Sequence, residues 1–325
     1  MQKNCTEVSG ETRVRKTCLS EIYSLAQQNP KVFFIGSDLG SGTMEDFKKR
    51  LPDRFFMESI SEGNVIGMAA GLALEGNIVY VNTISTFLTR RAYEQICIDI
   101  CLHNLPVRLI GNGGGLVYAP LGPTHMATDD IALMRTLPNM TIIAPSDAQE
   151  MKFLMKETVS YPGPIYVRVA KGGDPIVSSQ LNLKKIGKAS IYGSGNDFVL
   201  ITTGIMLDIA LKAHSNLLEK GLTGKIIHFH TIKPFDEEKL IECIKKTKIV
   251  VSIEEHNRIG GLGSAVAEVM MGCQLKTLPK FKKFALPDAF PDDYGSQSFL
   301  LEKYGLTTDN IVSTVTIELL NEKRS

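Results

Sequence analysis

Short apolar runs alternate with longer amphipathic segments along most of the chain. In the first half, the runs at 32–36, 78–82, 107–111, 141–144 and 165–169 are bounded by Gly, Pro, Asn or Asp. Continuous apolar runs of this kind are typical of strands that are buried on both faces of a parallel sheet. The segments between them predict helices at 15–28, 62–74, 86–104, 128–136 and 148–160, the last of them capped by Asp147.

The alternation lapses after the fifth run and then resumes. Residues 171–179 are rich in Gly, Pro and Ser and have no periodicity, which is typical of a domain boundary. Strands are predicted again at 198–203, 225–230 and 249–253, with helices at 206–220 and 236–246 and another that begins after Gly263. The sequence therefore predicts an α/β protein of two domains, 1–185 and 186–325, each a mainly parallel sheet covered by helices.

Composition and charge narrow the classes of function. The 325 residues carry 36 basic and 35 acidic side chains, so the net charge of +1 gives no field that would attract nucleic acid or an anionic membrane. The N-terminus lacks the apolar segment of a signal peptide, and no run approaches the roughly 20 apolar residues of a spanning helix. We expect a cytoplasmic protein without nucleic-acid or membrane partners, whose six scattered cysteines are reduced.

One carboxylate is unusual because of its neighbours. Glu62 opens the predicted helix 62–74, and the other residues of that helix are almost all small or apolar. Burying an ionised carboxylate without a partner costs several kcal/mol or shifts its pKa upward. We therefore expect a specific partner for Glu62, although the helix dipole alone would also favour an acid in the first turn.

Further polar and aromatic side chains follow predicted strands, at the sheet edge where α/β proteins bind ligands. Residues 84–95 bring Phe87 and Tyr93 to the start of a helix, where an aromatic ring either stacks on a flat ligand or packs in the core. The Gly-rich loop 111–125 ends at His125, which is either a proton carrier or a structural histidine. His228 and His230 alternate on a predicted strand without a third ligand nearby, so no metal site is predicted.

Four motifs in a fixed order resemble the thiamine-diphosphate-dependent transketolase family. They are Ser61-Glu62 before the small-residue helix, Ser85-Thr86-Phe87-Leu88 with Arg91-Ala92-Tyr93-Glu94-Gln95, Gly122-Pro123-Thr124-His125, and Ala144-Pro145-Ser146-Asp147. The resemblance covers about residues 15–320 and implies a pyrimidine-binding domain followed by a transketolase C-terminal domain, whose pattern 253–263 matches. The chain is also similar to 1-deoxyxylulose-5-phosphate synthase and to the β chain of 2-oxo-acid dehydrogenase E1.

The resemblance implies a role for each candidate site residue. Glu62 would hydrogen-bond a ring nitrogen of the cofactor's aminopyrimidine and so promote loss of the thiazolium proton, a role that a raised pKa would suit. Phe87 would stack on the pyrimidine, His125 would bond donor oxygens as a second catalytic residue, and Arg168 would approach the distal end of the substrate. By the same match Tyr93 lines the pyrimidine pocket. Ser37, Asp38 and Leu39, at the end of the first predicted strand, either line the same cofactor site or form a plain turn. The predicted substrate site also includes Arg90, Arg91, Asn112 and Leu121.

One family signature is missing. The diphosphate is held through Gly-Asp-Gly followed by Asn, and no Gly-Asp-Gly occurs in this sequence. The resemblance therefore implies a split enzyme, in which a separate chain carries this signature and most ligands of the Mg²⁺ or Ca²⁺ that accompanies thiamine diphosphate. Two copies of each chain would form an α2β2 heterotetramer that contains a homodimer of this chain, and the isolated chain is expected to be inactive.

Two departures from the family pattern bear on the substrate. Transketolases have Glu-Asp-Gly-Pro-Thr-His, whereas Leu121 stands here in place of the Asp that touches a donor hydroxyl, and Asn112-Gly113-Gly114 lacks a His that usually meets a phosphate. Because a hydroxyl unpaired against leucine is penalised, we expect two-carbon ketol transfer from a modified sugar or a short 2-oxo acid. The alternatives are an E1β-like decarboxylating subunit and a non-catalytic assembly subunit of the same fold.

Overall fold

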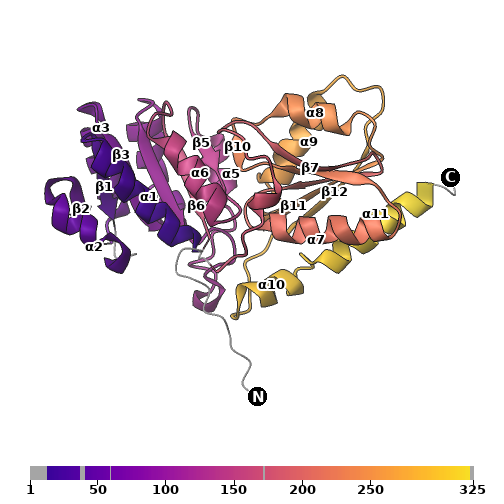
Figure 1. Cartoon of the computed structure of the whole chain (residues 1–325). Coiled ribbons are helices and arrows are strands. Elements are labelled where there is room, and N and C mark those ends of the chain that lie inside the picture. Colours follow the sequence, from indigo (N-terminus) through magenta and orange to yellow (C-terminus); the bar gives the residue numbers. More distant parts are fainter. Residues whose placement is uncertain (1–12, 37–40, 59, 171–172, 323–325) are drawn as a thin grey trace, which may run out of the picture.

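Two β-sheets, each with helices on both faces, lie side by side along the chain (Figure 1). The computed structural model describes residues 13–36, 41–58, 60–170 and 173–322. The first sheet has seven strands in the order β10-β5-β6-β4-β3-β1-β2, and the second has five in the order β12-β11-β8-β9-β7. The predicted fold class, α/β with two mainly parallel sheets, is confirmed. Among the described residues, no helix has the length and apolar character needed to cross a membrane.

The first sheet is built from the N-terminal half of the chain. Its parallel strands are β1 (Val32–Gly36), β2 (Phe55–Met57), β3 (Ile78–Ile84), β4 (Val107–Asn112), β5 (Thr141–Ile143) and β6 (Ile165–Val169). One face is covered by α1 (Val14–Gln28), α2 (Ser41–Arg50) and α6 (Ala148–Thr158). The other face is covered by α3 (Glu62–Leu74), α5 (Asp130–Thr136) and an irregular helix between β3 and β4. A short 3₁₀ turn, η1 (Pro52–Arg54), precedes β2.

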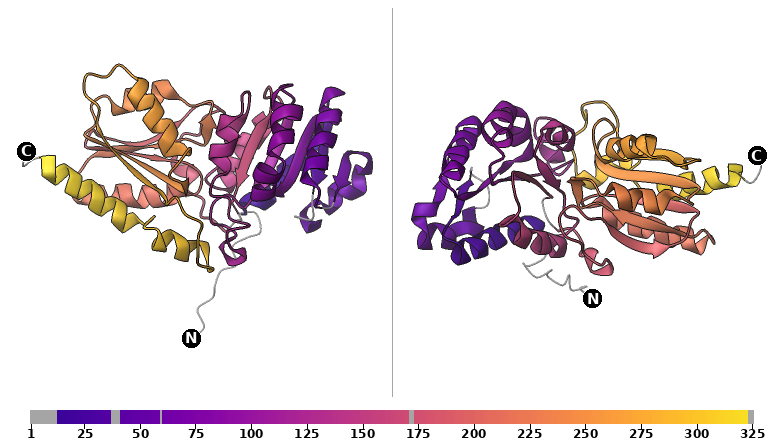
Figure 2. Two further views of the ribbon diagram at one scale, coloured as in Figure 1. Left: turned by 180° about the vertical axis from the view of Figure 1, so that it is seen from behind. Right: turned by 90° about the horizontal axis from the view of Figure 1, so that it is seen from above.

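The second sheet has the same layered arrangement (Figure 2). Its strands are β7 (Ser190–Ser194), β8 (Phe198–Thr202), β9 (Gly224–His228), β11 (Ile249–Asn257) and β12 (Lys280–Leu286), of which only β7 runs antiparallel to its neighbour. The helices α7 (Met206–Glu219) and α11 (Thr308–Glu322) cover one face, and α8 (Glu237–Ile244) and α9 (Leu262–Gly272) cover the other. The short helix α10 (Gln297–Lys303) lies next to the junction between the two halves.

Every predicted strand is present, but four strands were not predicted. These are β2, β7, β12 and β10 (Thr231–Lys233). The predicted strand 225–230 ends at His228, and the chain then crosses to the first sheet, where β10 pairs antiparallel with β5. A strand of three residues has too few positions to display a period, so its pairing depends on the tertiary structure.

The predicted helix 86–104 is present in an irregular form. The chain forms two π-helical segments, η2 (Phe87–Arg91) and η3 (Ile96–Cys101), separated by the short α4 (Tyr93–Gln95). The break falls at Ala92, whose φ of −104° and ψ of 20° depart from helical values. Wide turns of this kind are frequent at functional sites. The apolar spacing of the segment is helical, and it does not distinguish a π-turn from an α-turn.

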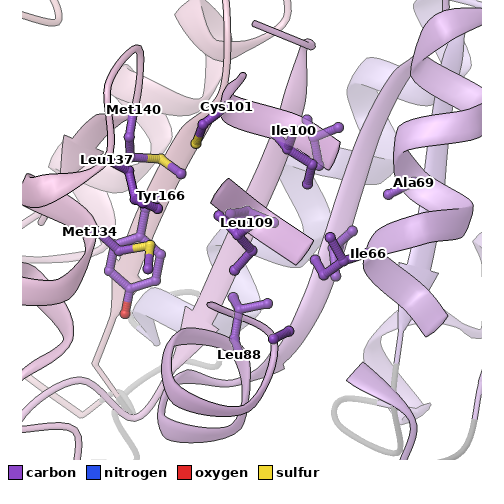
Figure 3. Packing of buried hydrophobic residues seen from close by; sticks show 14 of the residues in the cluster. Ile66, Ala69, Leu88, Ile100, Cys101, Leu109, Met134, Leu137, Met140 and Tyr166 are labelled. Atoms are coloured by element: carbon purple, nitrogen blue, oxygen red, sulfur yellow. The ribbon is translucent and has the colours of Figure 1, made fainter. Parts of the chain in front are cut away.

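A continuous core fixes α3 and the irregular helix on the first sheet. Figure 3 shows Ile66 and Ala69 of α3 with Leu88, Ile100 and Leu109, all fully or almost fully buried. A separate small cluster joins the halves of the chain, because Leu116, Ala119 and Met126 of the first half pack with Leu286, Leu300 and Leu306 of the second. The Gly-rich loop therefore packs its own apolar side chains against the second domain.

Candidate active site

Glu62, at the start of α3, forms one contact group with Phe87 and Arg91, the first and last residues of η2. The Glu62 side chain is only 3% exposed, and its Oε2 accepts a hydrogen bond of 2.7 Å from Arg91 Nη1. The Arg91 Cζ atom lies 4.5 Å from the centroid of the Phe87 ring. The structure thus provides a partner for Glu62, as expected for a buried carboxylate, and that partner is an arginine on the neighbouring helix.

His125 joins this group from the Gly-rich loop. Its ring lies 5.1 Å from the Phe87 ring, in an edge-on arrangement with an interplanar angle of 68°. The His125 Nδ1 and Thr124 Oγ1 atoms are 2.9 Å apart. The structure therefore brings together Glu62, Phe87 and His125, three residues that are far apart in the sequence.

The loop that carries His125 is held by Arg90. The guanidinium donates to both carboxylate oxygens of Asp129, at distances of 2.8–3.1 Å, and Nη2 also donates to the carbonyl of Met126. Such bidentate pairing fixes geometry as well as charge. Arg90 lies next to the predicted site and holds the segment after His125, whereas its predicted contact with a substrate stays a prediction.

A buried network lies at the same edge of the sheet, around Asp130. Its Oδ2 accepts hydrogen bonds of 2.8 Å from Arg168 Nε and from the Tyr166 hydroxyl, which itself lies 2.5 Å from Ser85 Oγ. Arg168 Nη2 donates to the carbonyls of Ala127 and Glu255. Arg168 is thus held inside the protein rather than in the Glu62 group, and its predicted contact with a substrate stays a prediction.

The Asp130–Arg168 pair has strong electrostatic effects. Burial by itself would raise the pKa of Asp130, but the Arg168 guanidinium and a contribution from His256 hold it below its ordinary value. Burial would likewise lower the pKa of Arg168, and the carboxylate of Asp130 raises it instead. Both groups are therefore charged at neutral pH. Asp130 could not be recognised from the sequence, because an acid at the start of a predicted helix is explained by the helix dipole.

Three buried oxygen atoms near this network have no hydrogen-bond partner among the described residues. They are Thr86 Oγ1, Asn112 Oδ1 and Asp130 Oδ1. The Nδ2 group of Asn112 is engaged by Asn82 Oδ1 and the Thr83 carbonyl, at 2.8 and 3.0 Å. Buried polar atoms are usually paired with protein, water or ligand, so this part of the strand edge is suited to a polar ligand.

Glu255 brings the second domain to the Gly-rich loop. The backbone N–H of Leu116 and the amide of Gln297 donate to its Oε1, at 2.9 and 2.7 Å. Gly115 has a φ of +70°, and a Cβ atom there would come within 2.3 Å of Glu255 Oε2, so only glycine fits. Burial raises the pKa of Glu255 to about 7, in spite of the nearby Arg168.

A second contact between the domains joins α6 to β9. His228 Nε2 and Glu150 Oε2 lie 3.0 Å apart, both side chains are fully buried, and the Ser146 N–H also donates to Oε2. Burial would raise the pKa of Glu150, but His228 and His230 lower it to about 2. The sequence could not reveal this carboxylate as a partner of His228, since 78 residues separate them. Among the residues that the structure describes, no three His, Cys, Asp or Glu side chains are grouped to hold a metal ion.

The remaining predicted residues lie in three different situations. Ser37, Asp38 and Leu39 lie outside the described residues. The Tyr93 hydroxyl lies 2.6 Å from Thr136 Oγ1, and its ring packs partly on the first core. Leu121 is 51% exposed and ends the 3₁₀ turn η4 (Ala119–Leu121). The ring of Tyr294, from the second domain, lies against the next residue, Gly122.

The contact group around Glu62 fits the aminopyrimidine half of thiamine diphosphate. The buried Glu62 carboxylate already accepts a hydrogen bond from the flat guanidinium of Arg91, and this guanidinium stacks on the Phe87 ring. A flat nitrogen heterocycle could make the same two contacts. The fit covers only this half of the cofactor, because the sequence lacks the Gly-Asp-Gly signature for the diphosphate.

Comparison with known families agrees with the two-domain fold. Residues 11–173 match the family described as the transketolase pyrimidine binding domain, and residues 187–311 match the transketolase C-terminal domain. The chain belongs to the transketolase family, as the sequence resemblance predicted.

Individual relatives extend this result over nearly the whole chain. A 6-deoxy-6-sulfo-D-fructose transketolase subunit of Clostridium sp. (strain MSTE9) is 32% identical over 301 residues, which cover 92% of each protein. An apulose-4-phosphate transketolase subunit of Phocaeicola vulgatus is 33% identical, and the match covers 92% of this chain and 95% of the relative. A solved structure described as a split gene transketolase, inactive beta4 tetramer, has a TM-score of 0.85 and 35% identity, covering 95% of this chain and 98% of that chain.

Proposed function

We propose that this chain is the subunit of a split, thiamine-diphosphate-dependent transketolase that binds the pyrimidine half of the cofactor. The enzyme transfers a two-carbon ketol unit from a ketose to an aldehyde. When bound, thiamine diphosphate supplies the electron sink for that unit. Glu62 hydrogen-bonds a ring nitrogen, the Phe87 ring stacks on the pyrimidine, and His125 bonds donor oxygens of the substrate.

The observation that carries the proposal is the geometry around Glu62. Its carboxylate is buried beside an aromatic ring, and His125 approaches the same ring from a loop of a different strand. A carboxylate kept from water and next to a stacking surface is suited to exchange a proton with a flat nitrogen base. Membership of the transketolase family gives that base a chemical identity.

A partner chain follows from what this chain lacks. The diphosphate signature is absent from the sequence, and two relatives that this chain matches over more than nine-tenths of their length are named as transketolase subunits. The partner would carry Gly-Asp-Gly and Asn with most ligands of Mg²⁺ or Ca²⁺, and two copies of each chain would form an α2β2 heterotetramer. The related structure described as an inactive tetramer of β chains supports an inactive isolated chain.

The substrate is proposed to be a sugar other than the common pentose phosphates. Leu121 stands where the family has an acidic contact to a donor hydroxyl, and half of its side chain is exposed to meet a ligand. Two relatives are named for 6-deoxy-6-sulfo-D-fructose and apulose 4-phosphate, which are both unusual sugars. A less polar contact at this point would favour a donor that lacks the usual hydroxyl pattern.

The test uses this chain together with a partner chain that contains Gly-Asp-Gly and a later Asn, sought in the neighbouring reading frame. The two chains are co-expressed, and the complex is assayed with thiamine diphosphate and Mg²⁺. Phosphorylated and unphosphorylated ketoses are offered as donors with aldose acceptors, and 2-oxo acids are offered in parallel with a lipoyl domain as acceptor. We expect turnover only by the complex, and we expect the Glu62→Gln complex to assemble normally with activity lowered by about 10²- to 10⁴-fold.

Each alternative gives a different result in the same assay. Turnover by this chain alone would contradict the split enzyme. Full activity of the Glu62→Gln complex would indicate an assembly subunit. Transfer to a lipoyl domain but not to an aldose would indicate an E1β-like enzyme, and equal rates with xylulose 5-phosphate and ribose 5-phosphate as in housekeeping enzymes would contradict the unusual substrate.

A further inference from the structure

Arg91 makes the same two contacts that the proposed function assigns to the aminopyrimidine ring. Its Nη1 donates to Glu62 Oε2 at 2.7 Å, and its Cζ lies 4.5 Å from the centroid of the Phe87 ring. A guanidinium is planar, carries N–H donors on its edge and stacks on aromatic faces. An aminopyrimidine is also planar, with an amino group and ring nitrogens on its edge.

Both groups cannot occupy this position together. A ring that hydrogen-bonds Glu62 Oε2 and stacks on the face of Phe87 that Arg91 covers would lie where the guanidinium now lies. His125 also contacts the Phe87 ring, but it meets that ring edge-on at 5.1 Å. A pyrimidine that makes both contacts therefore needs Arg91 to move.

We propose that Arg91 is a placeholder for the aminopyrimidine. Its guanidinium pairs with Glu62 and covers Phe87 in the cofactor-free chain, and it turns out into solvent when the ring binds. This inference rests on the proposed function, because it assumes that the ring contacts both residues. The proposal gives Arg91 a role in cofactor binding, in place of the substrate contact that the sequence predicts.

The surroundings of Arg91 permit this movement. Its side chain is 49% exposed, and its guanidinium is held by Glu62 on one side and by the Phe87 ring on the other. The adjacent Arg90 differs, since it is bound to both oxygens of Asp129 and to a backbone carbonyl. Arg91 can thus leave without unpacking the core, while it protects the Glu62 carboxylate from being buried unpaired before the cofactor arrives.

A placeholder lowers the apparent affinity for the ring that it mimics. The apparent dissociation constant rises in inverse proportion to the fraction of molecules in which the position is open. If the Arg91 contact keeps the position closed in most molecules, its removal tightens binding by roughly tenfold. The change is expected in affinity for the pyrimidine alone, before any reaction takes place.

The experiment measures binding of 4-amino-5-hydroxymethyl-2-methylpyrimidine to the isolated chain of 325 residues by ligand-observed NMR or calorimetry. We expect Arg91→Ala to bind this probe roughly tenfold more tightly than the original chain, and Arg91→Lys to lie between them because an ammonium pairs with Glu62 but offers no flat face. Glu62→Gln should bind more weakly than the original chain. Lys212→Met, which removes an exposed cation paired with Asp208 on α7, is the matched control and should change nothing.

A rescue measurement tests whether the two groups share one position. Methylguanidinium should compete with the probe for Arg91→Ala, since it can refill the vacated place, and it should have little effect on the original chain. Circular dichroism of each variant establishes that the fold is retained, and Arg91→Lys preserves the charge if Arg91→Ala proves unstable.

The outcomes separate this inference from the proposed function. Equal or weaker binding by Arg91→Ala, together with loss of binding in Glu62→Gln, would overturn the placeholder and leave the pyrimidine site standing. Failure of every variant to bind the probe, or binding that is unchanged in Glu62→Gln, would overturn the pyrimidine site and the placeholder together.

Discussion

Two arginine–carboxylate pairs lie at the same edge of the first sheet and differ in burial. Arg168 and Asp130 are 7% and 0% exposed, whereas Arg91 is 49% exposed above a nearly buried Glu62. The Asp130 pair is also tied to Tyr166 and to carbonyls of both domains. The Glu62 pair is joined by one hydrogen bond from Arg91. The other contact of the Arg91 guanidinium is with the Phe87 ring.

The difference shows how one kind of ion pair can serve two purposes. A pair buried on both sides cannot open without leaving a charge unsolvated, so it holds the strand edge in one arrangement. A pair with one exposed partner can open because water receives the released cation. We therefore expect changes at Asp130 to act on stability and changes at Glu62 to act on binding and turnover.

The largest effect on stability is expected for Asp130→Asn. The substitution leaves the Arg168 guanidinium buried without its counter-charge, which should lower the free energy of unfolding by about 3–5 kcal/mol. Urea unfolding, followed by circular dichroism, measures the change. A loss below about 1 kcal/mol would show that the two ion pairs do not differ as their burial indicates.

The next effect concerns the pH dependence of stability at Glu255. Burial raises its pKa from 4.5 to about 7 in the folded chain, so the folded state binds a proton that the unfolded state has released between these values. The contribution of Glu255 is therefore fully present below pH 4.5 and is lost as the pH rises through 7. At about 1.4 kcal/mol per pKa unit, the loss is about 3 kcal/mol.

Comparison with Glu255→Gln isolates this contribution, because all other titrating groups are shared. Glutamine can still accept the hydrogen bonds from Leu116 and Gln297 and does not titrate. The stability of the variant relative to the original chain should rise between pH 4.5 and 7, as measured by urea unfolding at several pH values. A constant difference would mean that Glu255 is charged throughout.

The smallest stability effect is expected for Glu62→Gln. The glutamine carbonyl can still accept from Arg91, and the half-exposed guanidinium is hydrated if it does not, so the change should stay below about 1 kcal/mol. Unfolding in urea under the conditions used for Asp130→Asn gives the direct comparison. A loss as large as that of Asp130→Asn would make Glu62 a structural residue and would weaken its assignment to the cofactor.

Much of the framework could be predicted because its signals are local. Apolar runs bounded by turn residues identified the main strands, and Asp147 caps α6 as predicted, with its Oδ1 accepting from the N–H groups of Gln149 and Glu150. Strands of three residues, such as β10, carry too little pattern to be found. The π-turns after Phe87 also escaped prediction, because apolar spacing does not register a widened turn.

The candidate site, like the fold, could be predicted only in part. Local residue context together with motif order pointed to Glu62, Phe87 and His125, and the structure places these three in one contact group. Sequence spacing could not show that Arg91 pairs with Glu62. It also gave no sign of Asp130 as a buried centre, since its partners come from other strands.

The α/β class, the order of the two domains and the transketolase family could all be predicted from residue order, because they depend on periodicity and on motifs in linear sequence. Which charges meet became visible only in the folded chain. Arg91 of η2 reaches Glu62 of α3, and Glu255 reaches the Gly-rich loop from the second domain. The strength of an ion pair depends on its burial and its neighbours, and these are fixed only when distant segments pack together.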